Sequence, residues 1–565
     1  MQDSKSVNCQ NCKQDFVIEP DDFAFYEKMK VPAPTWCPEC RLQRRLVWRN
    51  ERVLSRGVCD LCGAKTISTY SQKTPFPVYC APCWRSDKWD ALKYGREYDF
   101  NKPFFAQFLE LFNVVPRPAI SQNGTNVNSE HSNMIQDVKN VYMSFSVITG
   151  SENVYYSANV NSSKEVIDGF NITDGELLYE CMDAQKSYNC AYIYWSKSCV
   201  NSRFLLDCND CQDCFGCVGL RGKSYYIFNE PYSKEEYVKK LEEYDLKSFV
   251  KQQEIEQHFW EFSQKFPRRF ARMINSVNST GDGITNSRNA KYAFNVSENE
   301  NVKYVLRCPQ VKDSMDVNHK GDGQLVYEHA LGGSMPGSNL ICILYGSPGI
   351  NHVSYSDYCG SSSDLFGCVG VKGKSYAILN RLYSKEEYEA LVPKIIEHMN
   401  AMPYTDKQGR VYKFGEFFPP QFSPFAYNET VANEYFPKSK DEALALGSTW
   451  KEVKHNEYEI TKEADELPDN VKDATDQITK EIIRCSKTSR AYKILPEELA
   501  FYQRMNVPLP RLHPDERHRQ RFLKRNPLKL WHRKCAKCSN EFETSYAPDR
   551  PEIVYCETCY QQEVI

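Results

Sequence analysis

The sequence has no apolar run of the length that a membrane-spanning helix needs. No stretch of the 565 residues approaches about 18 consecutive apolar side chains. The first residues, MQDSKSVNCQ, also lack the apolar segment of a secretory leader. We therefore expect a cytoplasmic protein that makes no contact with a membrane.

An excess of charge of either sign is missing as well. The 71 Lys and Arg residues nearly balance the 74 Asp and Glu residues, which gives a formal net charge of -3 at pH 7. Bulk charge of this size does not draw a chain to nucleic acid. Any such binding must come from a local basic patch.

Common catalytic motifs are also absent from the sequence. There is no glycine-rich phosphate loop, no GxSxG and no HExxH. Five acids could serve a carbohydrate-acting groove, although turn positions explain them equally well: Asp168, Asp174, Asp207, Asp210 and Asp213. We predict a protein without catalytic residues and keep a carbohydrate-acting enzyme as an alternative.

Cysteine, by contrast, is abundant. In a compartment that keeps thiols reduced, 24 cysteines indicate metal binding or core packing rather than disulfides. Eight lie between Cys9 and Cys83, eleven between Cys181 and Cys368, and five between Cys485 and Cys559. The outer groups and the middle group follow different patterns.

The N-terminal group consists of four CxxC pairs. Two such pairs complete a tetrahedral site of four thiolates, which suits zinc. Sequential pairing predicts one ion at Cys9, Cys12, Cys37 and Cys40, and another at Cys59, Cys62, Cys80 and Cys83. Buried or redox-active thiols are the alternative, although the helical context of a redox CxxC is not apparent.

The C-terminal group repeats this arrangement at an offset of 476 in the numbering. A third zinc site is predicted at Cys535, Cys538, Cys556 and Cys559, with identical gaps. The counterparts of the first site are Cys485, Thr488, His513 and Glu516. Cys485, His513 and Glu516 could still bind a metal, but we favour packing in place of the ion. The expected cofactor is Zn²⁺, in three sites and possibly four.

Each end of the chain also carries an arginine-rich stretch. If these stretches are helical, their arginines could bind phosphates and thereby dock RNA, DNA or the ribosome. The candidate residues are Arg41, Arg44, Arg45, Arg49, Arg517, Arg519, Arg521 and Arg525. A solvated charged face, or pairing with the acidic linker around 456–481, is the alternative.

The middle of the chain is a second duplication. FGCVGLRGKSYYIFNEPYSKEEY (215–237) matches FGCVGVKGKSYAILNRLYSKEEY (366–388) at an offset of 151 residues. Short β-prone runs separated by Ser, Asn, Asp and Gly predict a mainly β fold, a parallel β-helix or solenoid in two repeats. We expect coils of roughly 20–30 residues, with a β-sandwich as the alternative.

Helices are expected at 103–113, 234–265 and 384–400, with Ser233 and Glu236 forming a capping box for the second. The predicted order is 1–102 (tandem zinc-ribbon module), 103–233 (first solenoid repeat), 234–267 (helical connector), 268–383 (second solenoid repeat), 384–484 (helix and acidic linker) and 485–565 (second zinc-ribbon module with one degenerate site).

Four cysteines in the first repeat have the spacing of an iron–sulfur run: Cys208, Cys211, Cys214 and Cys217. The second copy has Ser362 and Leu365 where the first has Cys211 and Cys214. A position that accepts either cysteine or leucine indicates the core, so we predict a ladder of buried thiols.

The runs CPECRLQRRLVWRNERVL, SDKWDALKYGREYDF and FGCVGLRGKSYYIFN resemble a family of uncharacterised zinc-ribbon and repeat proteins from candidate-phylum, small-genome bacteria. The resemblance implies zinc binding and a cytoplasmic location. Together with the residues, it indicates a non-enzymatic zinc scaffold that binds nucleic acid or a ribonucleoprotein. The alternative is a protein-interaction or self-assembling protein, a homo-oligomer through its end modules.

Overall fold

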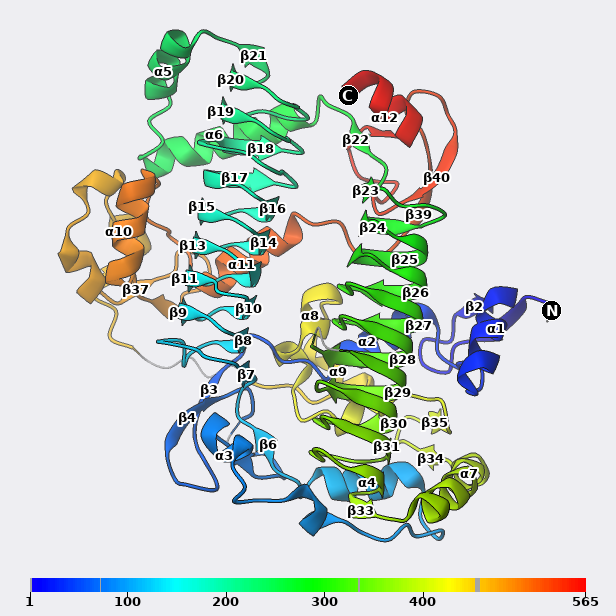
Figure 1. Ribbon diagram of the computed structural model, residues 1–565. Helices are drawn as coiled ribbons and strands as arrows, with labels where there is room; N and C mark the ends of the chain where they lie inside the picture. Colours follow the sequence, from blue (N-terminus) through cyan, green and yellow to red (C-terminus); the bar gives the residue numbers. More distant parts are fainter. Residues whose placement is uncertain (1–2, 72, 334–335, 453–457, 565) are drawn as a thin grey trace.

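Two β-solenoids, each built from parallel strands, lie side by side, and their coils progress in opposite directions (Figure 1). The computed structural model describes residues 3–71, 73–333, 336–452 and 458–564. Solenoid 1 begins at β7 (Gln122–Asn123) and ends at β21 (Glu230–Pro231), whereas solenoid 2 runs from β23 (Met273–Ile274) to β33 (Arg381–Leu382). The predicted mainly β, solenoid fold is confirmed.

The inner strands of solenoid 1 are β8 (Asn133–Gln136), β9 (Lys139–Tyr142), β10 (Phe145–Ile148), β11 (Glu152–Tyr155), β12 (Ala158–Asn161), β13 (Lys164–Ile167), β14 (Phe170–Thr173), β15 (Glu176–Tyr179), β16 (Met182–Gln185), β17 (Tyr188–Tyr194), β18 (Arg203–Leu206), β19 (Gln212–Phe215) and β20 (Ser224–Ile227). Those of solenoid 2 are β24 (Gly281–Thr285), β25 (Arg288–Ser297), β26 (Glu300–Leu306), β27 (Val311–Asn318), β28 (Gly323–Gly332), β29 (Gly337–Gly346), β30 (Ile350–Ser356), β31 (Ser362–Phe366) and β32 (Ser375–Ile378).

The coils of the solenoids are short. Most are 12 residues long, as the hydrogen bonds between equivalent residues of successive coils show. Val154 accordingly pairs with Val166, which in turn pairs with Leu178. The coil length that the sequence analysis expected, about twice this, is therefore wrong.

The backbone explains the short coil. Asp168, Asn171, Asp174 and Leu177, each three residues after the last, all have a φ between 53° and 57°. Each such residue turns a corner in the left-handed region of backbone space. Four corners close one coil.

The residue after each corner faces the solenoid interior. Ile172 and Leu178, which follow the corners at Asn171 and Leu177, are fully buried in the core of solenoid 1. Burial of this inward row in successive coils supplies the hydrophobic stabilisation of the solenoid. The inward period of three differs from the period of two that strand alternation predicts.

Cys208, Cys211, Cys214 and Cys217 occupy the four inward positions of one coil. All four are at most 1% exposed, and the Cys208 thiol donates to the carbonyls of Leu206 and Cys217 at 3.6 and 3.5 Å. Among the described residues they do not form a group that could hold a metal. The prediction that these thiols lie in the core is confirmed by their burial, since coils on both sides cover them.

Helices pack near the ends of the solenoids or along their side. They are α4 (Phe104–Phe112), α5 (Lys234–Glu243), α6 (Phe249–Ser263) and α7 (Lys385–Ala401). Helix α5 packs on β20 and α7 on β32, whereas α6 packs along the side, on β18. Ser233 and Glu236 form the expected capping box, and Ser384 with Glu387 repeats it. The predicted helix over 234–265 is divided, since Asp245 adopts a φ of 39° between α5 and α6. None of the helices in the described ranges has the length and apolarity that crossing a membrane requires.

The end modules are built from hairpins and short helices. The hairpins are β1 (Lys5–Asn8) with β2 (Asp15–Ile18), β3 (Ser55–Val58) with β4 (Lys65–Ser68), β37 (Ile483–Arg484) with β38 (Ala491–Tyr492), and β39 (Trp531–Lys534) with β40 (Glu541–Thr544). The helices are α1 (Pro20–Met29), α2 (Pro38–Leu46), α3 (Ala81–Arg85), α10 (Pro496–Met505), α11 (Pro514–Leu523) and α12 (Glu557–Val564).

Each end module docks on the solenoid that is farther from it in the sequence. Helix α2 of the N-terminal module packs on β27 and β28 of solenoid 2. Helix α11 of the C-terminal module reaches solenoid 1, where Arg517 contacts Asp168. Figure 1 shows this crossing of the blue and red ends of the chain. The two halves of the molecule are therefore built from interleaved segments.

Two short strand pairs each join one end module to the start of one solenoid. Strand β5 (Val78–Tyr79) pairs with β6 (Arg117–Pro118), just before solenoid 1. Strand β41 (Val554–Tyr555) pairs with β22 (Arg268–Arg269), just before solenoid 2. The N-terminal module also touches the end of solenoid 2, where Trp84 packs by Gly370. The C-terminal module touches solenoid 1 near its end, where the Tyr560 hydroxyl bonds Asp207.

One buried histidine in solenoid 2 makes stability depend on pH. His329 follows the corner at Glu328, is fully buried, and has its pKa lowered to about 3 by burial. The folded state keeps this ring neutral, while the unfolded chain binds a proton below about pH 6.5. Stability is therefore lost as the pH falls from about 6.5 towards 3.

We predict that His329→Gln reduces the acid sensitivity of the protein. Between pH 6.5 and pH 5 the free energy of unfolding of the unmodified protein should fall by about 2 kcal/mol more than that of the variant. Urea unfolding at both pH values measures the difference. His352→Gln, at an exposed position of β30, is the matched control. Equal pH slopes for all three proteins would contradict the assignment.

Candidate metal centres and buried arginine clusters

Three groups of four cysteines bring their sulfur atoms together. Within each group all Sγ atoms lie within 4.8 Å of one another. The groups are Cys9, Cys12, Cys37 and Cys40; Cys59, Cys62, Cys80 and Cys83; and Cys535, Cys538, Cys556 and Cys559. These are the three sets that sequential pairing of the CxxC motifs predicts.

The sulfur spacing fits a tetrahedral metal ion. The Sγ atoms of Cys12 and Cys37, and those of Cys62 and Cys80, are 3.8 Å apart, and those of Cys538 and Cys556 are 3.6 Å apart. Four sulfurs at about 2.3 Å from a central ion, the usual zinc–thiolate bond, have edges of about 3.8 Å. Each group could therefore hold one metal ion.

The backbone around each first cysteine prepares it as a ligand. The N–H groups of Cys37, Cys80 and Cys556 donate to the sulfurs of Cys9, Cys59 and Cys535 at 3.2 to 3.3 Å. Burial alone would raise the pKa of Cys59, but the backbone N–H groups of Cys80 and Cys62 lower it to about 6. Donors aimed at the sulfur favour the thiolate, which is the form that binds metal.

The counterpart of the first cysteine group, at Cys485, Thr488, His513 and Glu516, keeps the loop conformation of a CxxC pair but not its four thiolates. Ser489 follows Cys485 by four residues and has a φ of 56°, as Lys13, Gly63 and Ser539 do after their cysteines, with φ between 63° and 73°. Its backbone also donates to the carbonyl of Cys485, at 3.2 Å. The duplicated loop has therefore survived the replacement of Cys12 by Thr488.

The remaining candidate ligands of that site have other partners. Nδ1 of His513 accepts from the backbone of Asp515 at 3.1 Å and caps α11. Glu516 forms ion pairs with Arg519 and Lys487 at 2.7 and 3.2 Å. Among the described residues, Cys485, His513 and Glu516 do not form a group that could hold a metal. His513 and Glu516 are thus engaged by neighbours on and around α11 rather than gathered with Cys485.

The arginines of α2 are buried against acids of solenoid 2. Arg41 and Arg45 both contact Asp316, at 2.9 and 3.0 Å, and Arg45 also contacts Glu328 at 2.8 Å. Arg44 bridges Glu328 and Glu416 at 2.8 and 2.6 Å. The side chains of all three arginines are at most 1% exposed.

Helix α11 repeats this cluster on solenoid 1. Arg517 and Arg521 share Asp168, at 2.7 and 2.9 Å, and Arg521 also contacts Glu180 at 2.8 Å. Arg517 and Arg521 correspond to Arg41 and Arg45 at the offset of 476. Two related ion clusters therefore join the two end modules to the two solenoids.

The expectation that these arginines form an exposed phosphate-binding face is wrong for most of them. Arg41, Arg44, Arg45, Arg49, Arg517 and Arg521 are at most 5% exposed. Arg525 is half-buried against Phe170, and Arg519 is exposed but paired with Glu516. A charged guanidinium is buried only beside a group that compensates its charge. Acids of the solenoids do this for Arg41 and Arg45 of α2 and for Arg517 and Arg521 of α11. The alternative, pairing with the acidic linker at 456–481, lies partly outside the described residues. The partners found for Arg41, Arg45 and Arg521 are solenoid acids instead.

The acids proposed for a carbohydrate site have structural roles. Asp168 is fully buried under Arg517 and Arg521, and Asp207 contacts Arg221 at 3.0 Å. Asp174, Asp210 and Asp213 occupy corners with φ between 48° and 54°. Structural roles as ion-pair partners or corner residues therefore explain all five.

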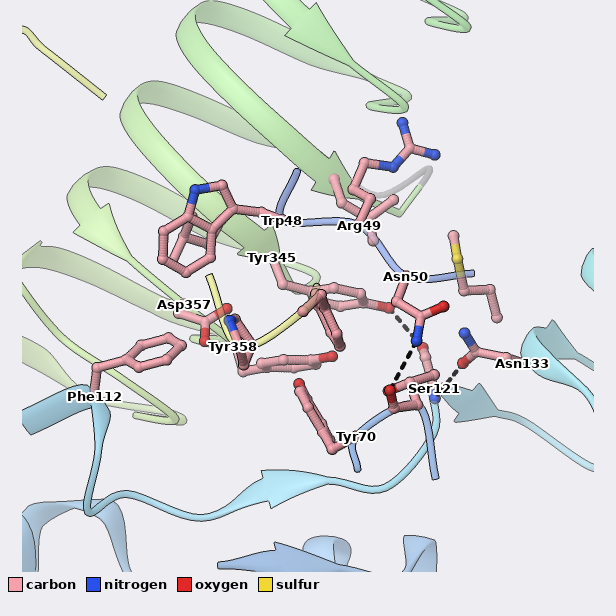
Figure 2. A pocket seen from close by; sticks show the side chains of 16 residues that line it. Trp48, Arg49, Asn50, Tyr70, Phe112, Ser121, Asn133, Tyr345, Asp357 and Tyr358 are labelled. Carbon is pink, nitrogen blue, oxygen red and sulfur yellow. Dashed lines mark hydrogen bonds between the residues drawn. The ribbon is translucent and has the colours of Figure 1, made fainter. Parts of the chain in front are cut away.

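A narrow cleft lies where the segment 48–50 after α2, the first turn of solenoid 1 and the side of solenoid 2 meet (Figure 2). Tyr345 stacks on Tyr358 with ring centres 4.2 Å apart, and its hydroxyl bonds Ser121 at 2.6 Å. Burial raises the pKa of Asp357 to about 6, although Arg117 lies 2.9 Å away. The cleft holds about 50 Å³, room for one or two waters. It is a joint between segments and too small for an organic ligand.

No protein-family model, no curated protein and no solved structure matches the chain. Its function is therefore argued from the metal sites, the ion clusters and the cavities of the molecule itself.

We predict three metal ions per chain, one for each group of four cysteines. Cys62→Ser should reduce the content from three ions to two, because three thiolates and a hydroxyl bind the ion far more weakly. Elemental analysis of the purified protein measures the content. Cys211→Ser, in the thiol ladder, is the matched control and should retain all three. Equal loss in both variants would contradict the assignment.

We predict that Arg45→Leu destabilises the protein by about 3–5 kcal/mol, because it leaves Asp316 and Glu328 buried with less compensating charge. Arg288→Leu removes an exposed pair with Glu300 and should cost less than about 1 kcal/mol. Urea unfolding at pH 7 compares the two. A small effect of Arg45→Leu would show that the cluster contributes little to docking of α2.

Proposed function

We propose that the protein is a non-enzymatic scaffold in which three zinc ions fasten two antiparallel solenoids into one rigid body. Zinc suits sites of four thiolates because it accepts tetrahedral geometry and soft sulfur ligands without redox chemistry. The sulfur edges of 3.6 to 3.8 Å support this choice of ion.

The position of the second ribbon in each end module carries the proposal. The ribbon at Cys535–Cys559 lies between the two solenoids: β41 pairs with β22 before solenoid 2, and Tyr560 bonds Asp207 at the end of solenoid 1. The ribbon at Cys59–Cys83 repeats this with β6 and Gly370. A metal ion at each place would hold the short strand and helix that bridge the solenoids.

Arginine burial directs the proposal away from nucleic acid at α2 and α11. A surface for phosphates needs accessible guanidinium groups, and these helices use theirs within the chain. The end modules likewise contact the solenoids of their own chain. This supports closure within one molecule over pairing of end modules between molecules.

The role of the ion can be tested at one ribbon. Cys538→Ser combined with Cys556→Ser should remove one zinc ion and increase amide hydrogen exchange in β41, β22 and α12, because the bridge loses its anchor. The interior strands β13 to β15 should keep their protection. Hydrogen exchange read by mass spectrometry measures both regions.

The matched control is Cys214→Ser combined with Cys217→Ser, which changes two thiols of the ladder. It should leave exchange at β22 and β41 unchanged. Purified protein without stoichiometric zinc, or unchanged protection of β22 in the Cys538 and Cys556 double variant, would overturn the scaffold proposal.

A further inference from the structure

A cavity of about 290 Å³ lies between solenoid 1, helix α6 and the C-terminal module. Tyr179, Glu180 and Tyr192 form its solenoid wall, Phe249 and Glu256 belong to α6, and the segment 508–512 with α11 completes it. Its volume is near the lower end of the range for sites that bind small molecules. The metal sites and ion clusters do not account for it.

The duplicated half of the molecule shows why the cavity exists. Trp36, Arg44 and Trp48 of the N-terminal module correspond to Leu512, Gln520 and Lys524 at the offset of 476. Trp36 is 1% exposed, with the Arg44 guanidinium 4.5 Å from its ring centre. In the C-terminal module these places hold Leu512, Gln520 and Lys524, all of which line the cavity. Loss of bulky side chains has therefore opened the space.

A cation has been added at the same place. Arg511 replaces the counterpart Thr35, lines the cavity and is 7% exposed. Its guanidinium donates to the carbonyls of Ala464 and Pro468 at 2.6 and 3.1 Å, and within the described part of the chain it forms no ion pair. Burial lowers the pKa of Arg511 and outweighs Asp469 and Asp465, which lie close enough to raise it. A buried guanidinium whose charge is not fully compensated gains from an anion bound beside it.

The side chains that line the cavity carry more positive than negative charge. Five cations line it: Lys487, Arg511, Arg517, Arg521 and Lys524. Glu180 and Glu256 are the carboxylates of the wall. Asp168, Glu516, Asp465 and Asp469 lie behind the wall and compensate these cations from outside the cavity. On the lining itself cations outnumber carboxylates, which favours a ligand with a negative group.

Aromatic rings also line the cavity. Tyr179 and Tyr192 pack edge to face with ring centres 5.6 Å apart, and both are largely buried. Phe249 lies 4.8 Å from the Arg511 guanidinium and adds a second aromatic surface beside that cation. A ligand of matching chemistry has an apolar, flat body and an oxyanion at one end.

We propose that this cavity binds a small organic oxyanion, a phosphate or carboxylate carried on an aromatic or apolar body. Arg511 binds the oxyanion, and Tyr179, Tyr192 and Phe249 contact the body. The C-terminal module, which lost one metal site, has thereby gained a ligand site. This site is independent of the three zinc ions, so either proposal can fail without the other.

Titration calorimetry of the full-length protein with phenyl phosphate, benzoate and benzyl alcohol tests the site. Phenyl phosphate or benzoate should bind with saturable heat at one site per chain, and benzyl alcohol about tenfold more weakly or not at all, because it lacks the charge. The two anions distinguish phosphate from carboxylate. Absence of saturable binding by both anions would overturn the proposal.

Two variants copy the filled half of the molecule. Leu512→Trp restores the residue found at position 36 and should abolish binding by filling the space, while its melting temperature shows that it folds. Arg511→Thr restores the residue found at position 35 and should weaken binding of the anion by about tenfold or more. Arg519→Thr, which removes an exposed cation of α11 outside the cavity, should bind like the unmodified protein. Full affinity in either of the first two variants would overturn the proposal.

Discussion

Guanidinium groups buried against carboxylates at the solenoid corners hold the end modules in register. Asp316 and Glu328 occupy the same corner of successive coils of solenoid 2 and present two acids in a column to α2. Arg41 and Arg45 lie on successive turns of that helix. The spacing of their guanidinium groups is close enough to the spacing of the two acids for three ion pairs to form. A buried charge tolerates few alternative partners, so these contacts specify position more than they add stability.

Duplication explains both the likeness of the two halves and their differences. Asp168 and Glu180 repeat the column of Asp316 and Glu328 at an offset of 148, not 151, because the two steps after β28 span 14 and 13 residues where the matching coils of solenoid 1 span 12. The clusters keep their geometry in both halves despite this insertion. The two end modules differ most clearly at one group of four cysteines, two tryptophans and one arginine, which are present in the N-terminal module and absent from the C-terminal one.

The metal sites were predictable from the sequence and the docking was not. CxxC spacing alone identified twelve ligands, because a thiolate pair at that spacing has few structural alternatives. The solenoid followed from repeated short strands, but its coil length did not, since the corners accept residues as different as Asp168 and Leu177. The burial of Arg41 and Arg521 could not be read from charge patterns, because the acids that pair with them are distant in the chain. Arg41 and Asp316 are 275 residues apart, and Arg521 and Glu180 are 341 residues apart.

The crossed docking of the end modules has a consequence for synthesis of the chain. Solenoid 1 leaves the ribosome long before the C-terminal module, so Asp168 and Glu180 on its face remain unpaired until Arg517 and Arg521 have been made. The first ribbon module likewise waits for solenoid 2. Non-local contacts of this kind fold slowly and expose unsatisfied surface meanwhile. A nascent chain of this protein therefore carries uncovered acidic columns until translation is almost complete, and premature termination leaves them permanently bare.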